Sequence, residues 1–208
     1  MGDEVLFKYR SIQNWKYLLD IFLRKRLYAA AYKEMNDPME GRFFYHDDRI
    51  CEEFIRAIHN QKKEWRICSL SRNHRNTLMW SYYADGHRGI AVGIKLKDPK
   101  AKEYTVKRVK YGLKLRLDQA WIKAGPEQVT LHILSQKQTG WKHENEVRIF
   151  SRINTFVDVE ITKVCFGVET SRKDRDLISA LVKATAPEAE LVRLKRDQLD
   201  KPMEDFAS

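Results

Sequence analysis

Residues 140–152 read GWKHENEVRIFSR, and the alternation of charged and apolar side chains in the second half of this stretch predicts a β-strand. Glu144 and Glu146 are two positions apart, and alternate residues of a strand point to the same face. Arg148 continues that face, whereas Val147 and Ile149 on the opposite face are expected to enter the core. Two interpretations are open: the carboxylates line a ligand pocket, or they form an exposed charge ladder that Arg148 neutralises.

The composition around this stretch is that of a globular protein. The chain has 208 residues, of which 43% are hydrophobic and 33% charged, and this length suits one domain. We expect a single domain over residues 1–197 and a C-terminal tail over residues 198–208. No apolar run approaches the roughly 20 residues that span a bilayer, and the N-terminus lacks the order of a signal peptide. The sequence therefore predicts a cytoplasmic protein without a membrane partner.

Cysteine and histidine usage does not indicate a metal site. Cys51, Cys68 and Cys165 are widely spaced and lie in apolar contexts, so we expect them to be small buried hydrophobic residues. The six histidines are scattered singly, without the spacing of zinc ligands. A metal-dependent enzyme is not expected.

The net charge of +10 favours an anionic partner. The excess positive charge is concentrated in two segments rather than in a tail. Its residues are Lys62, Lys63, Arg66, Arg72 and Arg75 in the first segment, and Lys107, Arg108, Lys110, Lys114, Arg116 and Lys123 in the second. A nucleic-acid or nucleotide partner and a merely solvated basic surface are both consistent with this distribution.

The order of the expected elements predicts an α+β fold with a mostly antiparallel sheet, because helices and strands do not alternate regularly. The expected strands are 5–10, 66–71, 89–96, 104–111, 140–153, 157–168 and 190–194. The expected helices are 13–26 after a cap at Ser11, 47–63 from Asp47 or Asp48, 77–84, 126–138, and one that starts at Ser171.

Two shorter segments carry further predictions. In NDPMEG, residues 36–41, the side chains of Asn36 and Asp37 suit a structured turn. In the helix predicted at 77–84, an apolar stripe leaves Trp80 off its main line. Trp80 is therefore a candidate ligand contact.

Four patches together resemble a family of bacterial proteins known as a domain of unknown function, DUF2971, to which the abortive-infection protein AbiGi looks similar. The patches are LFKYRS at residues 6–11, NDPMEG at 36–41, CSLSRNHRNTLMWSYYADGHRGIAVGI at 68–94 and GWKHENEVRIF at 140–150. The likeness covers nearly the whole chain. It implies family membership more strongly than any one activity.

A more distant resemblance is to the R-S-E layout of ADP-ribosyltransferases. It implies a split sheet of the ADP-ribosyltransferase type, with NAD as the donor substrate. Arg10 would take the arginine role, Ser69 or Ser71 the serine role, and Glu146 the role of the catalytic glutamate, with Glu144 preceding it. The serine run is SLS, where these enzymes usually carry a Ser-Thr-Ser-like run, so both serines stay candidates.

The chemistry of NAD cleavage suits this set of residues. Breaking the bond between nicotinamide and ribose develops positive charge on the sugar, which a fixed carboxylate such as Glu146 stabilises. Arg10 can pair with the pyrophosphate through its planar fork. Tyr9, Trp80 and Tyr83 are candidates for stacking on the rings of NAD, although each also suits a packing role.

The leading hypothesis is an NAD-consuming ADP-ribosyltransferase that acts on nucleic acid or protein as an intracellular toxin or phage-defence effector. The alternative is a non-catalytic nucleic-acid-binding or antitoxin-like module of the same fold. An antitoxin or regulatory protein is a further expected partner. A nuclease is less favoured, because the carboxylates do not form a convincing metal site.

Overall fold

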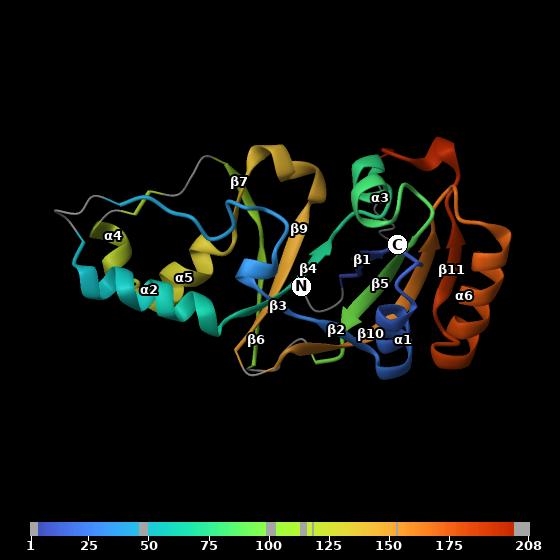
Figure 1. Cartoon of the computed structure of the whole chain (residues 1–208), viewed down its shortest axis with the longest axis horizontal. Helices are drawn as coiled ribbons and strands as arrows, with labels where there is room; N and C mark the ends of the chain where they lie inside the picture. The colour runs from blue at the N-terminus through green and yellow to red at the C-terminus, as the bar shows by residue number, and fades with distance from the viewer. Residues whose placement is uncertain are drawn as a thin grey trace.

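The computed structural model describes residues 4–45, 50–98, 103–112, 116–117, 119–152 and 154–201. A nine-stranded, mostly antiparallel sheet runs through the molecule, with helices at both of its ends (Figure 1). The strands are β1 (Leu6–Arg10), β2 (Arg26–Tyr28), β3 (Ala30–Ala31), β4 (Arg66–Ser71), β5 (Ile90–Leu96), β6 (Tyr104–Arg108), β7 (Lys110–Gly112), β8 (Gln136–Gln138), β9 (Glu146–Ser151), β10 (Phe156–Phe166) and β11 (Glu190–Arg193). The α-helices are α1 (Trp15–Arg24), α2 (Glu52–Glu64), α3 (Thr77–Tyr83), α4 (Gln119–Ile122), α5 (Gly125–Ile133) and α6 (Arg172–Thr185), and short 3-10 turns are η1 (Tyr32–Glu34), η2 (Thr139–Glu144) and η3 (Arg196–Gln198).

The strand order of the large sheet is β11-β10-β5-β1-β4-β9-β6, with β2 paired to β10 and β3 to β4. Strand β11 joins β10 in parallel, whereas the pairs from β10 to β6 are antiparallel. β1 pairs with β5 over its whole length but with β4 only at Phe7 and Ser71. The sheet therefore opens between β1 and β4, and this opening positions the candidate site.

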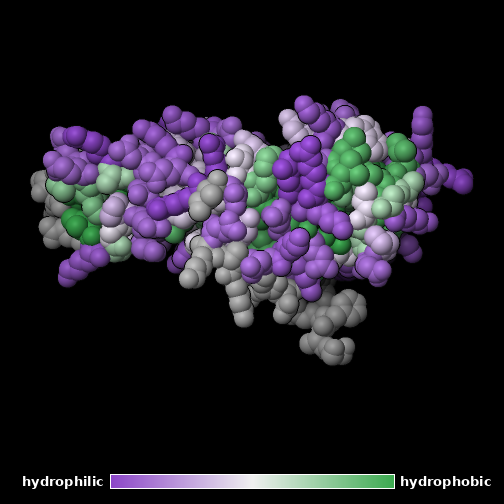
Figure 2. Space-filling model, turned by 90° about the horizontal axis from the view of Figure 1, so that it is seen from below, coloured by the Kyte–Doolittle hydropathy of each residue, from purple (hydrophilic) through white to green (hydrophobic). Residues whose placement is uncertain are grey.

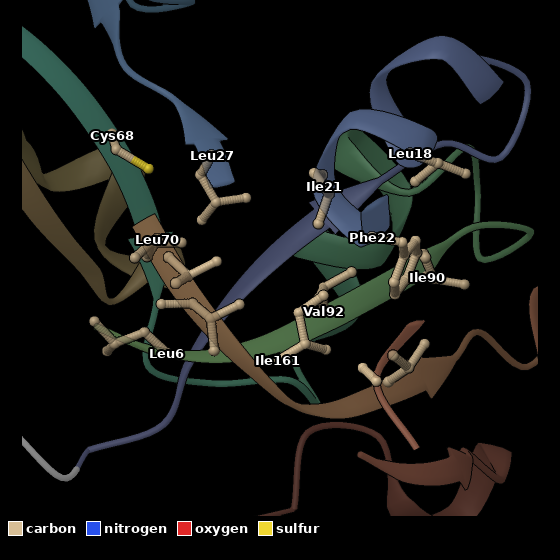
Figure 3. Packing of buried hydrophobic residues seen from close by; sticks show 14 of the residues in the cluster. Leu6, Leu18, Ile21, Phe22, Leu27, Cys68, Leu70, Ile90, Val92 and Ile161 are labelled. Atoms are coloured by element: carbon tan, nitrogen blue, oxygen red, sulfur yellow. The ribbon is translucent and has the colours of Figure 1, made fainter. Parts of the chain in front are cut away.

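Helices α1 and α6 cover one face of the sheet (Figures 1 and 3). α1 buries Leu18, Ile21 and Phe22, and α6 buries Ile178 and Val182, all in one cluster with the apolar residues of β5 and β10. Complete burial of one such side chain contributes about 1.5–3 kcal/mol. This cluster therefore holds most of the sheet in place.

Helix α3 covers the opposite face. It places Met79 and Trp80 against Phe7 and Tyr9 of β1 in a second cluster. Because neighbouring residues of β1 point to opposite faces, Leu6 belongs to the first cluster and Phe7 to the second. Strand β1 is thus buried on both of its faces.

Helices α2 and α5 pack together at the other end of the molecule, beyond β9 (Figure 1). A small cluster that includes Trp65, Leu134 and Phe150 links this end to the sheet. None of the helices in the described part of the chain is long and apolar enough to cross a membrane. Seen from below, hydrophilic residues cover most of the surface, and hydrophobic residues form separate patches, the larger of them toward the end that carries α1 (Figure 2). Leu19 and Leu23 of α1 are exposed.

The α+β architecture and the mostly antiparallel sheet confirm the predicted fold class. Three predicted boundaries are wrong. The strand expected at 140–153 begins only at Glu146, because residues 139–144 form η2. The strand expected at 104–111 is interrupted at Val109, whose amide donates to the carbonyl of Glu146 (2.9 Å). The helix expected to reach Gln138 ends at Ile133, and residues 136–138 pair with β7 instead.

Several local predictions also change. Ser11 does not cap α1, which begins after Asn14; the Ser11 hydroxyl accepts from the amide of Gln13 instead. Cys51 is exposed, unlike the other two cysteines. The start expected for the second helix, at Asp47 or Asp48, lies outside the described residues, and α2 begins at Glu52. Residues 198–201 of the expected tail lie against the domain, where Asp200 accepts from the amide of Thr77 (2.9 Å).

Candidate functional site

A cleft of about 400 Å³ occupies the opening between β1 and β4. Its walls come from these two strands, from residues 34–36 after β3, from α3, and from the segment around η2. The predicted residues that line it are Arg10, Tyr9, Ser69, Ser71, Tyr83, Glu144 and Glu146. This volume lies within the range of about 300–1,000 Å³ that is typical of small-molecule sites.

The two glutamates reach the cleft from different elements. Glu144 is the last residue of η2, and Glu146 is the first residue of β9. Asn145 between them has a left-handed backbone (φ 43°), which turns the chain so that both carboxylates contact the ammonium of Lys137. The prediction that the two carboxylates share a face of one strand is therefore wrong, although they do lie together.

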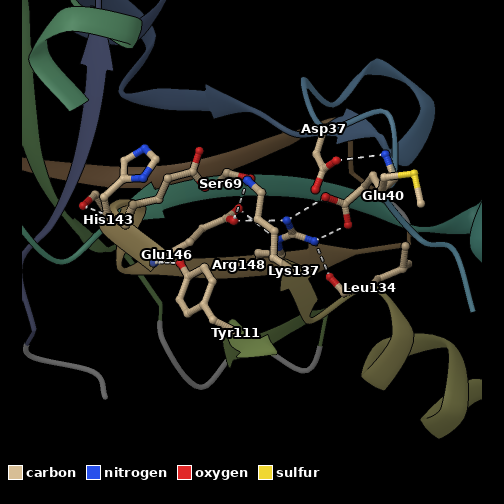
Figure 4. Close-up of polar contacts among 12 residues, drawn as sticks. Asp37, Glu40, Ser69, Tyr111, Leu134, Lys137, His143, Glu146 and Arg148 are labelled. Carbon is tan, nitrogen blue, oxygen red and sulfur yellow. Dashed lines mark hydrogen bonds and ion pairs between the residues drawn. The ribbon is translucent and has the colours of Figure 1, made fainter. Parts of the chain in front are cut away.

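Arg148 anchors Glu146 from within the protein (Figure 4). Its side chain is completely buried, with its Nε 2.9 Å and its Nη2 3.0 Å from the two oxygens of the Glu146 carboxylate. The same guanidinium donates to both oxygens of Glu40 and to the carbonyl of Leu134. Arg148 thus does neutralise Glu146, as one interpretation of the sequence holds, but in a buried network rather than on an exposed face.

This network sets the ionisation of the carboxylates. Burial alone disfavours the charge on Glu146, but Arg148 and Lys137 outweigh it and lower the pKa of this carboxyl to about 2. Burial raises the pKa of Glu40 even though Arg148 opposes the shift. Glu146 is therefore ionised throughout the physiological pH range, which suits a fixed negative charge better than a proton carrier.

Glu144 is held by three groups from separate elements. Its carboxylate accepts from the hydroxyl of Tyr83 (2.6 Å) and from Lys137, and its backbone carbonyl accepts from the hydroxyl of Ser71 (2.7 Å). Burial, together with the hydrogen bond to Glu144, raises the pKa of Tyr83. Ser71 therefore ties the end of β4 to η2.

Ser69 is the other candidate serine, and it faces Glu146. It pairs with Arg148 in the register of β4 and β9, and it contributes to lowering the pKa of Glu146. Since the Ser71 hydroxyl is engaged with the backbone, Ser69 is the serine that the geometry favours for a ligand contact.

The opposite wall of the cleft is cationic. Lys8 and Arg10 alternate along β1, and Lys8 donates to the backbone carbonyl of Ser69 across the opening (2.8 Å). Burial, then the neighbouring charge of Arg10, lowers the pKa of Lys8 to about 8. The guanidinium of Arg10 is largely buried, and its Nε has no hydrogen-bond partner among the described residues. An anionic group entering the cleft would satisfy these donors.

The structure places Arg10 and Glu146 on two sides of the opening rather than side by side. Arg10 and Lys8 leave β1 on the face of Leu6, where α1 packs, whereas Glu146 leaves β9 on the face opposite Val147. From the cationic wall, Lys8 reaches across the opening to the backbone carbonyl of Ser69. A ligand that contacts all of them must therefore span the opening between β1 and β4.

Of the predicted aromatic ligand contacts, Trp80 belongs to the core, and Tyr9 lines the cleft while also packing in the core. Trp80 is completely buried, its indole donates to the carbonyl of His74 (2.8 Å), and it does not line the cleft. Tyr9 contributes to the cleft wall, but its ring packs edge-on against Trp80 (5.1 Å between centroids) and its hydroxyl donates to Asn73. The prediction of Trp80 as a ligand contact is wrong, because α3 presses this residue onto the sheet.

Several residues of the site were missed by the sequence interpretation. Lys137 and Glu40 join the glutamate network, Lys8 joins the cationic wall, and Tyr111 accepts a hydrogen bond from the amide of Glu146 (2.7 Å). Lys8 could have been identified, because it alternates with Arg10 on a predicted strand. His143, which follows Trp141 in the same segment, contacts the rings of Tyr82 (5.9 Å between centroids) and Trp141 (6.1 Å) and is not part of the cleft wall.

Within the described ranges, no group of three or more histidine, cysteine, aspartate or glutamate side chains is arranged to hold a metal ion. Comparison of the chain with protein-family models, with curated proteins and with solved structures gives no match. The function proposed below is therefore based on the geometry of the cleft.

Proposed function

We propose that the cleft between β1 and β4 binds NAD and that the protein transfers ADP-ribose from it to nucleic acid or protein. The observation that carries this proposal is the division of one cleft into a cationic wall, with Lys8 and Arg10, and a carboxylate wall, with Glu144 and Glu146. NAD has a matching division, with an anionic pyrophosphate at its centre and a ribose that becomes positive during cleavage.

In this proposal each wall has one task. Arg10 and Lys8 bind the pyrophosphate through charge-assisted hydrogen bonds. Glu146 holds a fixed negative charge beside the ribose that bears nicotinamide, and Glu144 adds a second. Arg148 and Lys137 keep Glu146 ionised and oriented. Ser69 is placed to hold the carboxamide of nicotinamide.

The transfer step needs no redox partner. The bond between C1′ of the ribose and N1 of nicotinamide breaks, and its electron pair leaves with neutral nicotinamide. An oxygen or nitrogen of the acceptor bonds to C1′ and releases a proton. Because the transition state resembles an oxocarbenium ion, the fixed charge of Glu146 stabilises it more than it stabilises bound NAD.

The sheet gives additional support. A sheet that opens between two central strands is what the resemblance to ADP-ribosyltransferases implies, and β1 leaves β4 after the single pair at Phe7 and Ser71. For the aromatic contacts, the geometry favours Tyr83 and Tyr28 over Trp80. Both tyrosines line the cleft, and Tyr28 is 41% exposed. We propose these two rings as the stacking surfaces for NAD.

One observation favours the alternative, a non-catalytic nucleic-acid-binding or antitoxin-like module. Both oxygens of Glu146 already accept hydrogen bonds from Arg148, so the carboxylate has a complete structural role without any ligand. In that case the protein would retain salt-dependent nucleic-acid binding after loss of the glutamates.

The test is nicotinamide release and label transfer from adenine-labelled NAD to RNA, DNA and protein. We expect Glu146→Gln to lower the rate by about 100-fold or more, the size of effect seen when one fixed electrostatic group of an active site is removed. Absence of nicotinamide release by the wild type with every acceptor would overturn the proposal.

Glu40→Gln is the matched control. Glu40 binds the same guanidinium as Glu146 but does not line the cleft between β1 and β4. This substitution therefore perturbs the hydrogen bonds of Arg148 without changing a residue of the proposed NAD site. We expect its rate to stay within a few-fold of wild type. Equal loss of activity in both variants, with equal loss of thermal stability, would assign Glu146 a structural role only.

A further inference from the structure

A second cleft of about 600 Å³ lies between residues 32–45 and α2. Its most distinctive feature is three consecutive aromatic residues. Phe43 is partly buried, with its ring centroid 6.0 Å from that of Tyr45 and 5.6 Å from that of His59. Phe44 and Tyr45 are 47% and 39% exposed. Large aromatic side chains exposed together beside a cleft indicate a binding surface.

Basic residues line the same cleft or lie next to it. Lys33 and Arg42 are exposed and line the cleft. Arg116 is adjacent as well, because its backbone forms a bridge with Phe44 and the amide of Leu117 donates to the carbonyl of Phe44 (2.7 Å). This arrangement brings a cation from the second basic segment to the aromatic residues.

Lys62 lies close to the rings of Tyr32 and Phe43. The sequence places it among the surface cations, but it is buried, donates to the carbonyl of Gly41 (2.8 Å), and lies 4.9 Å from the ring centroid of Tyr32 and 5.4 Å from that of Phe43. Its charge therefore fixes the loop and adds positive potential below the aromatic surface.

The acidic residues of this cleft are directed into the protein. Asp37 is buried and accepts from the amide of Met39 (2.8 Å), and Glu40 is buried and binds Arg148. The exposed charge of the cleft wall is therefore carried by lysine and arginine. An anionic ligand with flat rings matches this surface.

The two clefts adjoin. Met35 lines both of them, and the turn η1 contributes Tyr32 to the second cleft and Glu34 to the first. A chain-like ligand in the second cleft can therefore continue past Met35 toward the carboxylates of the first.

We propose that the second cleft binds single-stranded nucleic acid, with bases stacked on Phe44 and Tyr45 and phosphates paired with Arg42, Lys33 and Arg116. Stacking on aromatic side chains requires unpaired bases, which is why a single strand fits and a duplex does not. The inference that this strand is the acceptor of ADP-ribose rests on the proposed function, whereas the binding itself does not.

The experiment measures fluorescence anisotropy of a labelled 12-nucleotide RNA or DNA strand and of the matching duplex, without NAD. Phe44→Ala and Tyr45→Ala should each weaken single-strand binding by roughly 5- to 150-fold, the cost of one lost stack. Tyr82→Ala is the control, because Tyr82 is 63% exposed on α3 and lines neither cleft. It should change binding by less than 2-fold.

Two further measurements keep the test independent of any one variant. Arg42→Gln should lower the slope of log K against log salt by about 0.7, the value for one phosphate contact on a single strand. In the wild type, a photoreactive 4-thiouridine strand should cross-link within residues 42–45. Thermal unfolding of each variant verifies that it is folded.

The inference is overturned if the alanine variants bind like wild type, if the duplex binds as tightly as the single strand, or if the cross-links lie elsewhere. Measuring nicotinamide release in the absence of an acceptor distinguishes this inference from the proposed function. Release by Phe44→Ala at the wild-type rate, with strand binding lost, supports both. No release by the wild type with any acceptor, with strand binding lost in Phe44→Ala, refutes the transferase and leaves the binding site standing.

Discussion

Replacing Arg148 by methionine tests the buried network most directly. The substitution keeps most of the side-chain volume but removes the hydrogen bonds to Glu40, to Glu146 and to the carbonyl of Leu134. Two buried carboxylates then lose their shared cation, and Lys137 is the remaining ion-pair partner of Glu146 among the described residues (3.4 Å). Breaking a buried ion pair on one side typically costs about 3–5 kcal/mol. Since domains of this kind unfold at a cost of about 5–15 kcal/mol, Arg148→Met should be folded but clearly destabilised.

The effect of Arg148 on the free energy of unfolding should depend on pH, and the pKa of Glu146 gives the size of this dependence. The pKa of Glu146 is lowered from 4.5 to about 2, which corresponds to about 3 kcal/mol of stability at neutral pH. Because the folded-state pKa is depressed, this contribution is present above pH 4.5 and is lost as the pH falls toward 2. In Arg148→Met this stabilisation by the ionised Glu146 is already missing at pH 7. The difference in free energy of unfolding between wild type and variant should therefore shrink by at least about 2 kcal/mol between pH 7 and pH 3.

Urea denaturation followed by tryptophan fluorescence at pH 7, 5, 4 and 3 measures this difference. Arg152→Met is the matched control, because Arg152 follows the same strand but is 34% exposed and pairs with the exposed Glu127. Its cost should stay below about 1 kcal/mol and should not depend on pH in this way. The reasoning is refuted if Arg148→Met costs no more than the control, or if its cost is the same at pH 7 and pH 3.

Three further outcomes are expected. Arg10→Gln should weaken NAD binding by roughly 10- to 150-fold in calorimetric titration, because a hydrogen bond to a charged group contributes about 1.5–3 kcal/mol. Unchanged affinity would show that Arg10 does not bind the pyrophosphate. Trp80→Ala should lower the free energy of unfolding by about 3–5 kcal/mol and Tyr82→Ala by less than about 0.5 kcal/mol in the same urea assay, since Trp80 is fully buried and Tyr82 is 63% exposed. His74 is buried with its pKa lowered to about 4, so the unfolded chain takes up a proton that the folded chain does not as the pH falls from 6.5 to 4. Wild type should therefore lose about 2–3 kcal/mol more than His74→Phe between pH 7 and pH 4.5, and identical pH profiles would contradict this.

The sequence predicted those parts of the fold that depend on local periodicity. β4 and β11 lie within one residue of their predicted ranges, and Ser171 caps α6 as expected, with its hydroxyl accepting from the amide of Asp174 (3.1 Å). Alternation and capping are properties of neighbouring residues, so they can be recognised without the structure.

The parts that could not be predicted depend on long-range contacts. Glu40 is 108 positions from Arg148, and nothing in either segment identifies the other as its partner. The misassigned strand at Glu144 has a different, local cause: the left-handed turn at Asn145 and the hydrogen bond from its amide to the carbonyl of Lys142 override an alternating pattern that by itself suits a strand. Trp80 was misjudged because α3 has only two turns, which is too short for an apolar stripe to define the buried face.

The candidate site was predicted in its membership better than in its arrangement. Arg10, Ser69, Tyr83 and Glu146 do line one cleft. Their division between two faces of the sheet follows from the separation of β1 from β4, and that separation is a property of the strand pairing. The separation of β1 from β4 therefore cannot be predicted from the order of residues along the chain.

The position of Arg148 connects the two halves of the molecule energetically. Glu146 lines one cleft, Glu40 lines the other, and a single guanidinium binds both carboxylates. A guest that draws this cation toward Glu40 weakens its hold on Glu146, and the reverse is equally true. If a ligand in either cleft shifts this cation, it alters the affinity of the other cleft, and thermodynamic reciprocity then requires the same factor in both directions. Coupling of this kind does not require a domain movement, because both carboxylates bind the same guanidinium.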